Sequence, residues 1–485
     1  MAVPAKLRWV YRELGLHSLY GTGRDAWLII GARCCRMVAF GSVALILALF
    51  FSELEFSDTY IGLFMTLTLL GDVLLSVLLT AIADRVGRRR VLLGGSAMMV
   101  MSGAIFASFE NYWVLLLAAV AGVISATGGD FGPFRAIEES ILSTLTGPGS
   151  RADVLAWYVT VATLGQSVGT EAGGRAVHSL QHLEGWALVD AYHAVFWVYS
   201  AVGLLNMILM ALLSKRCEAQ PAEETSTEEA GLLLEDEEGS RESAEGDGSI
   251  LDREAKDKQR LFAQISPETR RTMSRLWFLL VADSLADGMT PYTLTTYYMD
   301  QKFHMAKSTL GDITSISYFL SFVSTIFASP LCRRLGLVNT MVFTHLPSSA
   351  AVLLFPLPGS LVLTVILLMI RTGLNNMDQA PRAAFIAAVV KPEERTAIMG
   401  ITSMLRTLAS AAGPTVTGVL AGQRRFWIAF VAAGALRIAY DLGLFAMFVN
   451  MRLYEHEEKG EAAATAAGAR RESDEEELRE LPKPQ

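Results

Sequence analysis

Several ionisable side chains stand inside long apolar runs of this sequence, where they could bind a charged solute or carry a proton. They are Arg33, Arg36, Asp72, Asp283, Asp287, Arg371, Asp378, Arg406, Arg437 and Asp441. An ionisable group at the centre of a lipid bilayer costs at least about 2.5 kcal/mol, so each should face a protein interior or a cavity. A static ion pair that holds helices together is the alternative for each of them.

Their spacing puts two pairs on single helix faces. Arg33 and Arg36 are three residues apart, and Asp283 and Asp287 are four apart, so each pair should project to one side of its helix. Asp72 could neutralise Arg36 from a neighbouring helix.

A further polar stripe follows a four, three, four spacing. It consists of Arg371, Asn375, Asp378 and Arg382, which therefore share one helix face. Arg371 lies deepest in its apolar run, so we expect it to anchor a substrate, with an internal ion pair as the alternative.

Three residues have a structural interpretation instead. Arg437 and Asp441 are four residues apart and can satisfy each other, and His345 is the one titratable residue of its apolar run. We expect all three to be structural.

Twelve apolar runs must position these residues. The chain has 485 residues, of which 52% are hydrophobic and 19% charged, and the runs approach the roughly 20 residues that a helix needs to cross a bilayer. They span residues 26–51, 60–83, 91–109, 112–133, 153–174, 190–213, 276–298, 309–331, 338–357, 360–381, 396–420 and 426–450. The sequence therefore predicts an all-α integral membrane protein with twelve transmembrane helices, in six-helix bundles over 26–213 and 275–450.

The remaining segments are polar. Residues 1–25 lack a cleavable signal pattern, 214–274 form an acidic linker and 451–485 a charged tail. Residues 218–254 carry fourteen acidic side chains against two arginines, so the linker should be largely disordered.

A sorting signal is predicted inside the linker. Glu228 followed by Leu232 and Leu233 fits the acidic dileucine pattern that sorting adaptors bind. It would direct the protein to a vacuolar or endosomal membrane, with the plasma membrane as the default.

Lysines and arginines in short loops predict the orientation. Loops on one side of the twelve runs carry Arg85, Arg88, Arg89, Arg90, Arg333, Arg334, Lys391 and Arg395. Cationic short loops lie in the cytosol, so both chain ends are expected there, although Arg424 and Arg425 on the other side break the rule.

The two halves repeat. Gly62 in DTYIGLF matches Gly311 in KSTLGDI, and Gly87 matches Gly336, both at an offset of 249. The stretch LGQSVGTEAGG from residue 164 then matches LASAAGPTVTG from residue 408, at an offset of 244. Such an ordered series predicts two parallel repeats. At a nearby offset of 250, the arginine at 33 corresponds to the aspartate at 283, so the halves offer opposite charges at matched depth.

The loop between the second and third runs resembles the signature loop of the major facilitator superfamily. The matching residues are Asp84, Arg85, Gly87, Arg88, Arg89 and Arg90, although Thr80 stands where the pattern usually begins with glycine. The resemblance covers nearly all of both halves. It implies a transporter whose halves rock around a central cavity lined by the first and seventh helices.

In this family the loop is a cytosolic latch. The resemblance implies that Asp84 caps a neighbouring helix end and that the arginines bridge to it, in keeping with the preference of anions for helix N-termini and cations for C-termini. Gly87 permits the tight turn. A simple cationic membrane anchor is the alternative.

A glycine-rich stretch in the fifth run resembles the signature of proton-coupled antiporters of the superfamily. It contains Gly165, Gly169, Gly173 and Gly174, but Thr170 replaces the proline and Ala156 the leading glycine; Gly413 and Pro414 repeat it in part. Close helix packing is the alternative interpretation. Glu171 inside the stretch favours proton exchange, because burial would suit its carboxylate to that role.

The sequence thus favours a secondary transporter that moves a small organic solute, coupled to protons. A membrane sensor that kept the fold without transporting is the alternative. An enzyme is disfavoured, since the chain shows neither a nucleophile motif nor a phosphate-binding loop. We expect a monomer in a lipid bilayer that needs no cofactor or metal and binds no nucleic acid.

Overall fold

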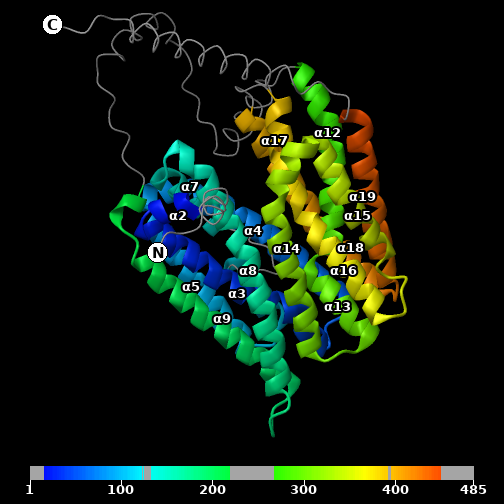
Figure 1. Ribbon diagram of the computed structural model, residues 1–485. Helices are drawn as coiled ribbons and strands as arrows, with labels where there is room; N and C mark the ends of the chain where they lie inside the picture. Colours follow the sequence, from blue (N-terminus) through cyan, green and yellow to red (C-terminus); the bar gives the residue numbers. More distant parts are fainter. Residues whose placement is uncertain (1–15, 123, 125–132, 219–266, 391–394, 449–485) are drawn as a thin grey trace, which may run out of the picture.

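The computed structural model describes residues 16–122, 124, 133–218, 267–390 and 395–448. These residues form two groups of helices that stand side by side (Figure 1). The sorting signal at Glu228, Leu232 and Leu233 lies outside the described residues, as does most of the acidic linker.

The N-terminal half begins with a short helix and continues with seven more. They are α2 (Leu16–Gly21), α3 (Arg24–Glu53), α4 (Asp58–Val86), α5 (Arg88–Phe106), α6 (Tyr112–Gly122), α7 (Pro133–Leu145), α8 (Pro148–Leu180) and α9 (Leu188–Ala211), followed by the 3-10 turn η1 (Lys215–Cys217). α3 is apolar on all sides and mostly buried, as expected of a helix enclosed by its neighbours.

The C-terminal half has the same order. Its elements are α12 (Pro267–Met289), α13 (Tyr292–Phe303), α14 (Lys307–Leu335), α15 (Leu337–Leu354), α16 (Leu361–Asn375), η2 (Asn376–Asp378), α17 (Gln379–Val389), α18 (Arg395–Gly422) and α19 (Phe426–Phe448). Pro291 separates α12 from α13, since proline lacks the N–H that a continuous helix needs.

Three predicted spans differ from the observed helices. The run 276–298 is divided at Pro291, the run 360–381 is interrupted by η2, and the helical region that begins at 112 resumes at Pro133 and reaches Leu145. Among the described residues, seven helices are long and apolar enough to cross a membrane by length and composition. The broken helices place polar backbone and charged side chains inside the bundle, which shortens their apolar stretches.

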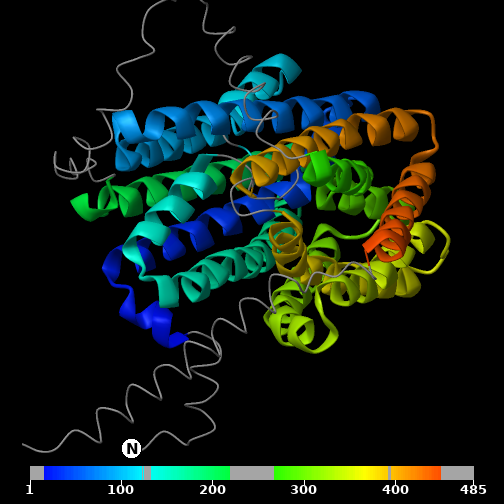
Figure 2. The same ribbon diagram turned by 90° about the horizontal axis from the view of Figure 1, so that it is seen from above.

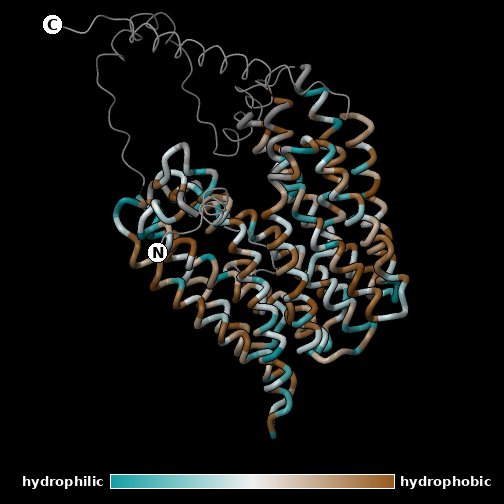
Figure 3. The backbone as a smooth tube through the Cα atoms, viewed as in Figure 1, coloured by the Kyte–Doolittle hydropathy of each residue, from teal (hydrophilic) through white to brown (hydrophobic). Residues whose placement is uncertain are grey.

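Large apolar side chains also cover the outside of the bundles. Leu117 is 70% exposed, Phe278 76% and Val362 67%. Apolar residues run along the helices, while hydrophilic ones gather at several loops and helix ends (Figure 3). An apolar surface of this kind is suited to lipid.

Two glycine turns mark one end of the molecule, which we name the basic end after Arg88, Arg89 and Arg90. Gly87 (φ 107°) lies between α4 and α5, and Gly336 (φ 82°) between α14 and α15. Residues other than glycine rarely adopt such a backbone conformation. The predicted repeat of these glycines is therefore also a repeat of structure.

The halves touch near the other end. A Cβ on Gly62 would lie 2.8 Å from the Cα of Gly418, and a Cβ on Gly174 would lie 2.8 Å from the Cα of Gly311. The repeat relates Gly62 to Gly311 and Gly174 to Gly418, so α4 crosses α18 as α14 crosses α8. In Figure 1 the halves approach at this lower end and diverge towards the basic end, and Figure 2 shows α4 and α18 side by side from above.

Candidate functional site: two buried charge networks

The N-terminal half holds a buried ion pair between α3 and α7. Arg36 donates two hydrogen bonds to Glu138, at 3.0 and 2.7 Å, and both side chains are fully buried. Tyr158 of α8 donates to the same carboxylate at 2.6 Å. Glu138 thus accepts from both terminal nitrogens of the Arg36 guanidinium, and the expected role of Asp72 towards Arg36 stays a prediction.

Arg33 belongs to the same region. Its guanidinium carbon lies 3.8 Å from the ring centroid of Tyr158, close enough for a cation–π contact. Arg33 and Asp72 are 2% and 3% exposed. The prediction that both charges avoid lipid is therefore confirmed. Arg33 faces Tyr158 of α8, and Arg36 faces Glu138 of α7.

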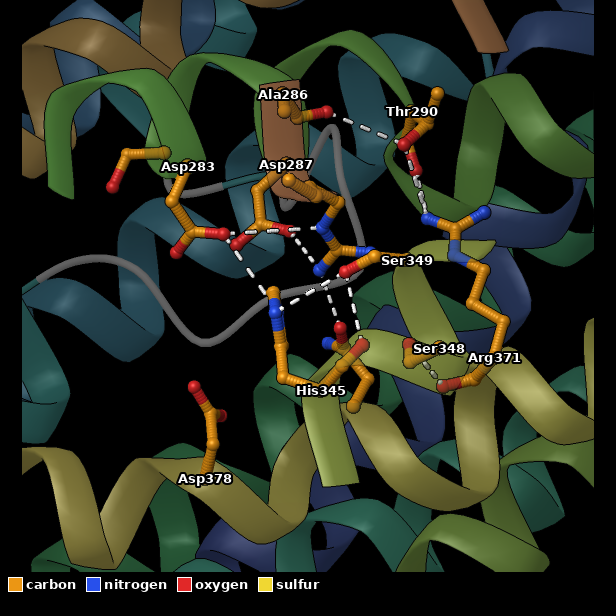
Figure 4. A network of polar contacts seen from close by, with 12 residues as sticks. Asp283, Ala286, Asp287, Thr290, His345, Ser348, Ser349, Arg371 and Asp378 are labelled. Atoms are coloured by element: carbon orange, nitrogen blue, oxygen red, sulfur yellow. Dashed lines mark hydrogen bonds and ion pairs between the residues drawn. The ribbon is translucent and has the colours of Figure 1, made fainter. Parts of the chain in front are cut away.

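The C-terminal half holds a larger network centred on Asp283 of α12 (Figure 4). One oxygen of this buried aspartate accepts a hydrogen bond from Arg382 of α17 at 3.0 Å. Its other oxygen lies 3.7 Å from Nε2 of His345 and 3.9 Å from Nε of Arg437. Arg382 also bonds Asp378, four residues earlier. The polar stripe predicted from Arg371 to Arg382 thus meets α12 at Asp283.

Arg437 and Asp441 do not satisfy each other as predicted. Arg437 bonds Asp287 at 2.5 Å and also Asn375, which brings the predicted residues of α12 and α16 together. Asp441 instead accepts from His345 and Ser349. The spacing along α19 predicted the wrong partners, because Arg437 and Asp441 bond residues of α12, α15 and α16 and not each other.

The prediction of an isolated His345 is wrong for the same reason. Its Nδ1 lies 2.7 Å from Asp441 of α19, while its Nε2 faces Asp283 of α12. The residue is isolated in sequence but central in space, since α15 packs against α19 and α19 packs against α12.

Two further arginines face neutral partners. Arg371 donates to the hydroxyl of Thr295 at 2.9 Å and to the carbonyl of Thr290, where α12 ends. Within the described residues it forms no ion pair. Arg406 of α18 donates to the hydroxyl of Ser284 at 3.1 Å. A cation at the C-terminal end of a helix is favourable by itself, so Arg371 also has a structural interpretation.

The repeat inverts the charges. In the N-terminal half the first helix carries the arginine (Arg36) and the α7 segment the acid (Glu138). In the C-terminal half the equivalent α12 carries the acid (Asp283) and α17 the arginine (Arg382). The Arg36–Glu138 and Asp283–Arg382 ion pairs thus each lie within one half in this conformation.

The signature loop is anchored to the end of α9. Arg89 donates to the carbonyl of Ala211 at 3.3 Å and Arg90 to that of Val86 at 3.3 Å, so cations sit at the C-termini of α9 and α4. Beyond α9, Ser214 is held by Asp25 at 3.0 and 2.5 Å. The side chains of the predicted latch residues Asp84 and Arg85 are outside the described part, so their roles remain predictions.

Cys217 is buried in the same junction. Burial raises the pKa of its thiol to about 11, and the nearby Asp25 carboxylate adds to the effect. The thiol is therefore inert at neutral pH.

The glycine-rich stretch packs closely against two helices. Gly165, Gly169 and Gly173 face backbone or Cβ atoms of α3, and Gly174 faces α14. In the second half, Gly413 lies against the backbone at Gly288 and Met289, and a Cβ on Gly62 would collide with the carbonyl of Pro414. Close packing is confirmed, which leaves antiport as a prediction.

Glu171 is less buried than the glycine-rich stretch led us to expect. Its side chain is 30% exposed and pairs with Arg175, which also bonds Asp312 of α14 at 3.1 Å. It belongs to the contact between the halves rather than to either buried network.

Comparison with known proteins decides the family. The model of the Major Facilitator Superfamily matches residues 29–267 and 276–481. The chain belongs to the Major Facilitator Superfamily. It is therefore a multi-pass membrane protein with the twelve-helix transporter fold, and the predicted fold class is confirmed.

Relatives of this superfamily member span most of its length. The uncharacterized membrane protein YJR124C of Saccharomyces cerevisiae is 32% identical over 433 residues, covering 88% of this chain and 95% of its own. The class G tetracycline resistance protein of Vibrio anguillarum is 24% identical over 384 residues, 77% of this chain and 84% of its own. The solved nucleoside transporter NupG has a TM-score of 0.62 at 14% identity, covering 88% of this chain and 99% of its own, which shows the shared fold.

Sequence reasoning missed Glu138 as a site residue. A signal was present: Phe134, Ile137, Ile141 and Leu142 are buried and lie on one face of α7, which includes position 138. A carboxylate within such an apolar stripe requires a cationic partner.

Proposed function

We propose that this superfamily member is a proton-coupled secondary transporter of a small organic solute. The observation that carries the proposal is the network around Asp283, in which carboxylates, arginines and a histidine from five elements each lie within 4 Å of an oppositely charged or titratable partner, and all but Asp287 are buried. Buried ionisable groups of membrane proteins commonly form proton or substrate pathways.

The contacts between the halves support alternating access. They gather near one end, at the crossings of α4 with α18 and α8 with α14, and the halves diverge towards the basic end (Figure 1). A transporter that rocks around a central site requires that such contacts can open. If the basic end is cytosolic, this conformation faces inward.

The substrate region is proposed to lie along Arg33, Asp287, Arg371 and Arg406. Asp287 is 37% exposed although Arg437 bonds it, so it is the part of the network nearest to a solute. As the halves rock, one of Asp283 and Asp287 is proposed to release its proton when an arginine such as Arg33 approaches.

The relative named for tetracycline resistance favours an organic solute as the substrate, and the glycine-rich stretch is consistent with antiport. A sensor without transport is the second candidate. The ion pairs inside each half leave the halves free to move apart, which favours transport.

The test uses purified full-length protein in liposomes of phosphatidylcholine and phosphatidylglycerol. Labelled tetracycline, uridine and a panel of sugars, peptides and organic acids would be tested with and without an imposed pH gradient. We expect at least one solute to accumulate only with the gradient, and both Asp283→Asn and Asp287→Asn to flatten the pH dependence. Transport indifferent to the gradient would contradict proton coupling, and no transport of any solute would favour the sensor.

A further inference from the structure

His345 lies between two buried carboxylates from different helices. Its side chain is 2% exposed, its Nδ1 is 2.7 Å from an oxygen of Asp441, and its Nε2 is 3.7 Å from an oxygen of Asp283. Figure 4 shows the ring of His345 directed from α15 towards Asp283. The bridge links α12 to α19 through one imidazole.

The hydrogen bonds determine which nitrogen of the neutral ring carries its hydrogen. An ionised carboxylate accepts hydrogen bonds and donates none, so Nδ1 must be the donor to Asp441. Ser349 donates to the other oxygen of Asp441 at 2.8 Å and thereby holds this carboxylate in place. The neutral ring is therefore the Nδ1–H form, and Nε2 has a free lone pair.

This lone pair faces another acceptor. The oxygen of Asp283 opposite Nε2 is buried and has no hydrogen-bond partner among the described residues. Two acceptors that face each other in a medium of low polarity repel, and a proton on Nε2 turns the repulsion into the attraction of an ion pair at 3.7 Å. The arrangement is favourable in the protonated state of the ring.

The ring belongs to a network of charged groups. The network contains Asp283 and Asp287 of α12, Asp378 of η2, Arg382 of α17, and Arg437 and Asp441 of α19, with the phenol of Tyr440 5.7 Å from the imidazole. Arg371 of α16 and Arg406 of α18 lie in the same half and bond hydroxyl groups of Thr295 and Ser284. Protonation of His345 adds one positive charge to this network.

We propose that His345 is the residue that binds the transported proton. Nε2 takes a proton from water on one side of the membrane, forming an N–H bond directed at Asp283, and returns it to water on the other side, so the ring alternates between neutral and cationic forms. Asp441 is a positioning residue that keeps the hydrogen on Nδ1. This assignment rests on the proposed proton coupling and narrows it from the aspartates to the histidine.

The same contact connects the proton to the solute region. The oxygen of Asp283 that faces His345 is also 3.9 Å from Nε of Arg437, and Arg437 bonds the partly exposed Asp287. A cationic ring competes with Arg437 for Asp283, so Arg437 turns further to Asp287. The charge that a solute meets at Asp287 then depends on the proton at His345.

The direct test needs no substrate. Full-length protein with ¹⁵N-labelled histidine in detergent micelles is titrated from pH 5 to pH 9, and the His345 signals among the seven histidines are assigned by their loss in His345→Gln. We expect the ring to pass from two protonated nitrogens to the Nδ1–H form, and Asp441→Asn to permit the Nε2–H form. One unchanged protonation state over the whole range would overturn the proposal.

Transport measurements distinguish a failure of this proposal from a failure of the proposed function. For each labelled solute of the panel that the native protein moves, we expect the transport rate to change approximately tenfold per pH unit. His345→Gln should abolish this pH dependence while solute exchange persists. Thr344→Val is the matched control, since this neighbouring hydroxyl bonds carbonyls of its own helix. A normal pH profile in folded His345→Gln would overturn the role of His345 alone. A native protein that transports without pH dependence would overturn the proposed coupling and this role with it, even if the ring titrates.

Discussion

Removal of the charge on Glu138 should destabilise the N-terminal half more than any other single change in its polar network. In Glu138→Gln the fully buried Arg36 keeps its charge but loses the carboxylate that binds both of its terminal nitrogens. Breaking a buried ion pair by removing one partner costs about 3–5 kcal/mol. Because both side chains are 0% exposed, solvent screening does not reduce this cost.

Tyr158→Phe is the control for this substitution. It removes the 2.6 Å hydrogen bond to Glu138 but keeps an aromatic ring beneath Arg33. A hydrogen bond to a charged group contributes about 1.5–3 kcal/mol, so the control should lose clearly less stability.

The assay is equilibrium unfolding of the purified full-length variants in mixed micelles, followed by tryptophan fluorescence and circular dichroism. The reasoning would be refuted if Glu138→Gln unfolded at the same denaturant concentration as the native protein. It would also fail if the two variants lost equal stability, since the charge of Glu138 would then contribute nothing beyond the tyrosine bond.

Asp84→Asn should strongly reduce transport in liposomes while membrane insertion and folded yield stay near normal, if the side chain acts as a latch; a proportional loss of folded protein would support the anchoring role instead. Gly174→Leu should prevent closure of the halves, since even a Cβ there would lie 2.7 Å from a backbone carbonyl of α14, and transport should be lost, whereas Gly94→Leu, which enters open space, should transport normally. Cys217 as sole cysteine should react slowly with maleimide at pH 8 because its thiol pKa of about 11 keeps it protonated; Asp25→Asn removes a negative charge, lowers that pKa and should accelerate labelling.

Most of the fold could be predicted from the sequence, because a lipid bilayer strongly restricts the segments that can cross it. Apolar length, the glycines at 87 and 336 and the offset between the halves predicted two repeated bundles, and the matching glycines at 62, 174, 311 and 418 do meet at the crossings between halves. Such features depend on local backbone requirements, which a sequence displays directly.

The candidate site could be predicted only in part. The sequence indicated which charges are buried, but not their partners, because these come from other helices. Arg437 and Asp441 fit a local pair yet bind Asp287 and His345. Glu138 was missed because it lies in α7, beyond residue 133, where the predicted run ended. Helix packing determines partner choice, and spacing within one helix does not contain that information.

The arrangement of charges explains how such a protein can hold buried ions and still move. Breaking a buried ion pair between the halves would cost about 3–5 kcal/mol in every cycle. Here Arg36 bonds Glu138 within one half, and Asp283 bonds Arg382 within the other.

The contacts between the halves are of a weaker kind. They include the hydroxyl of Thr415 on that of Thr66 at 2.7 Å, the phenol of Tyr297 on Asp58 at 2.6 Å, and the Arg175–Asp312 pair, whose side chains are 65% and 44% exposed. An exposed ion pair contributes about 0–1 kcal/mol, and water can replace each hydroxyl bond as the halves separate. The strong electrostatic interactions therefore lie within each of the two bundles, whose charges are arranged with opposite polarity. The contact that must open between the bundles consists of glycine crossings and of bonds that break at low cost.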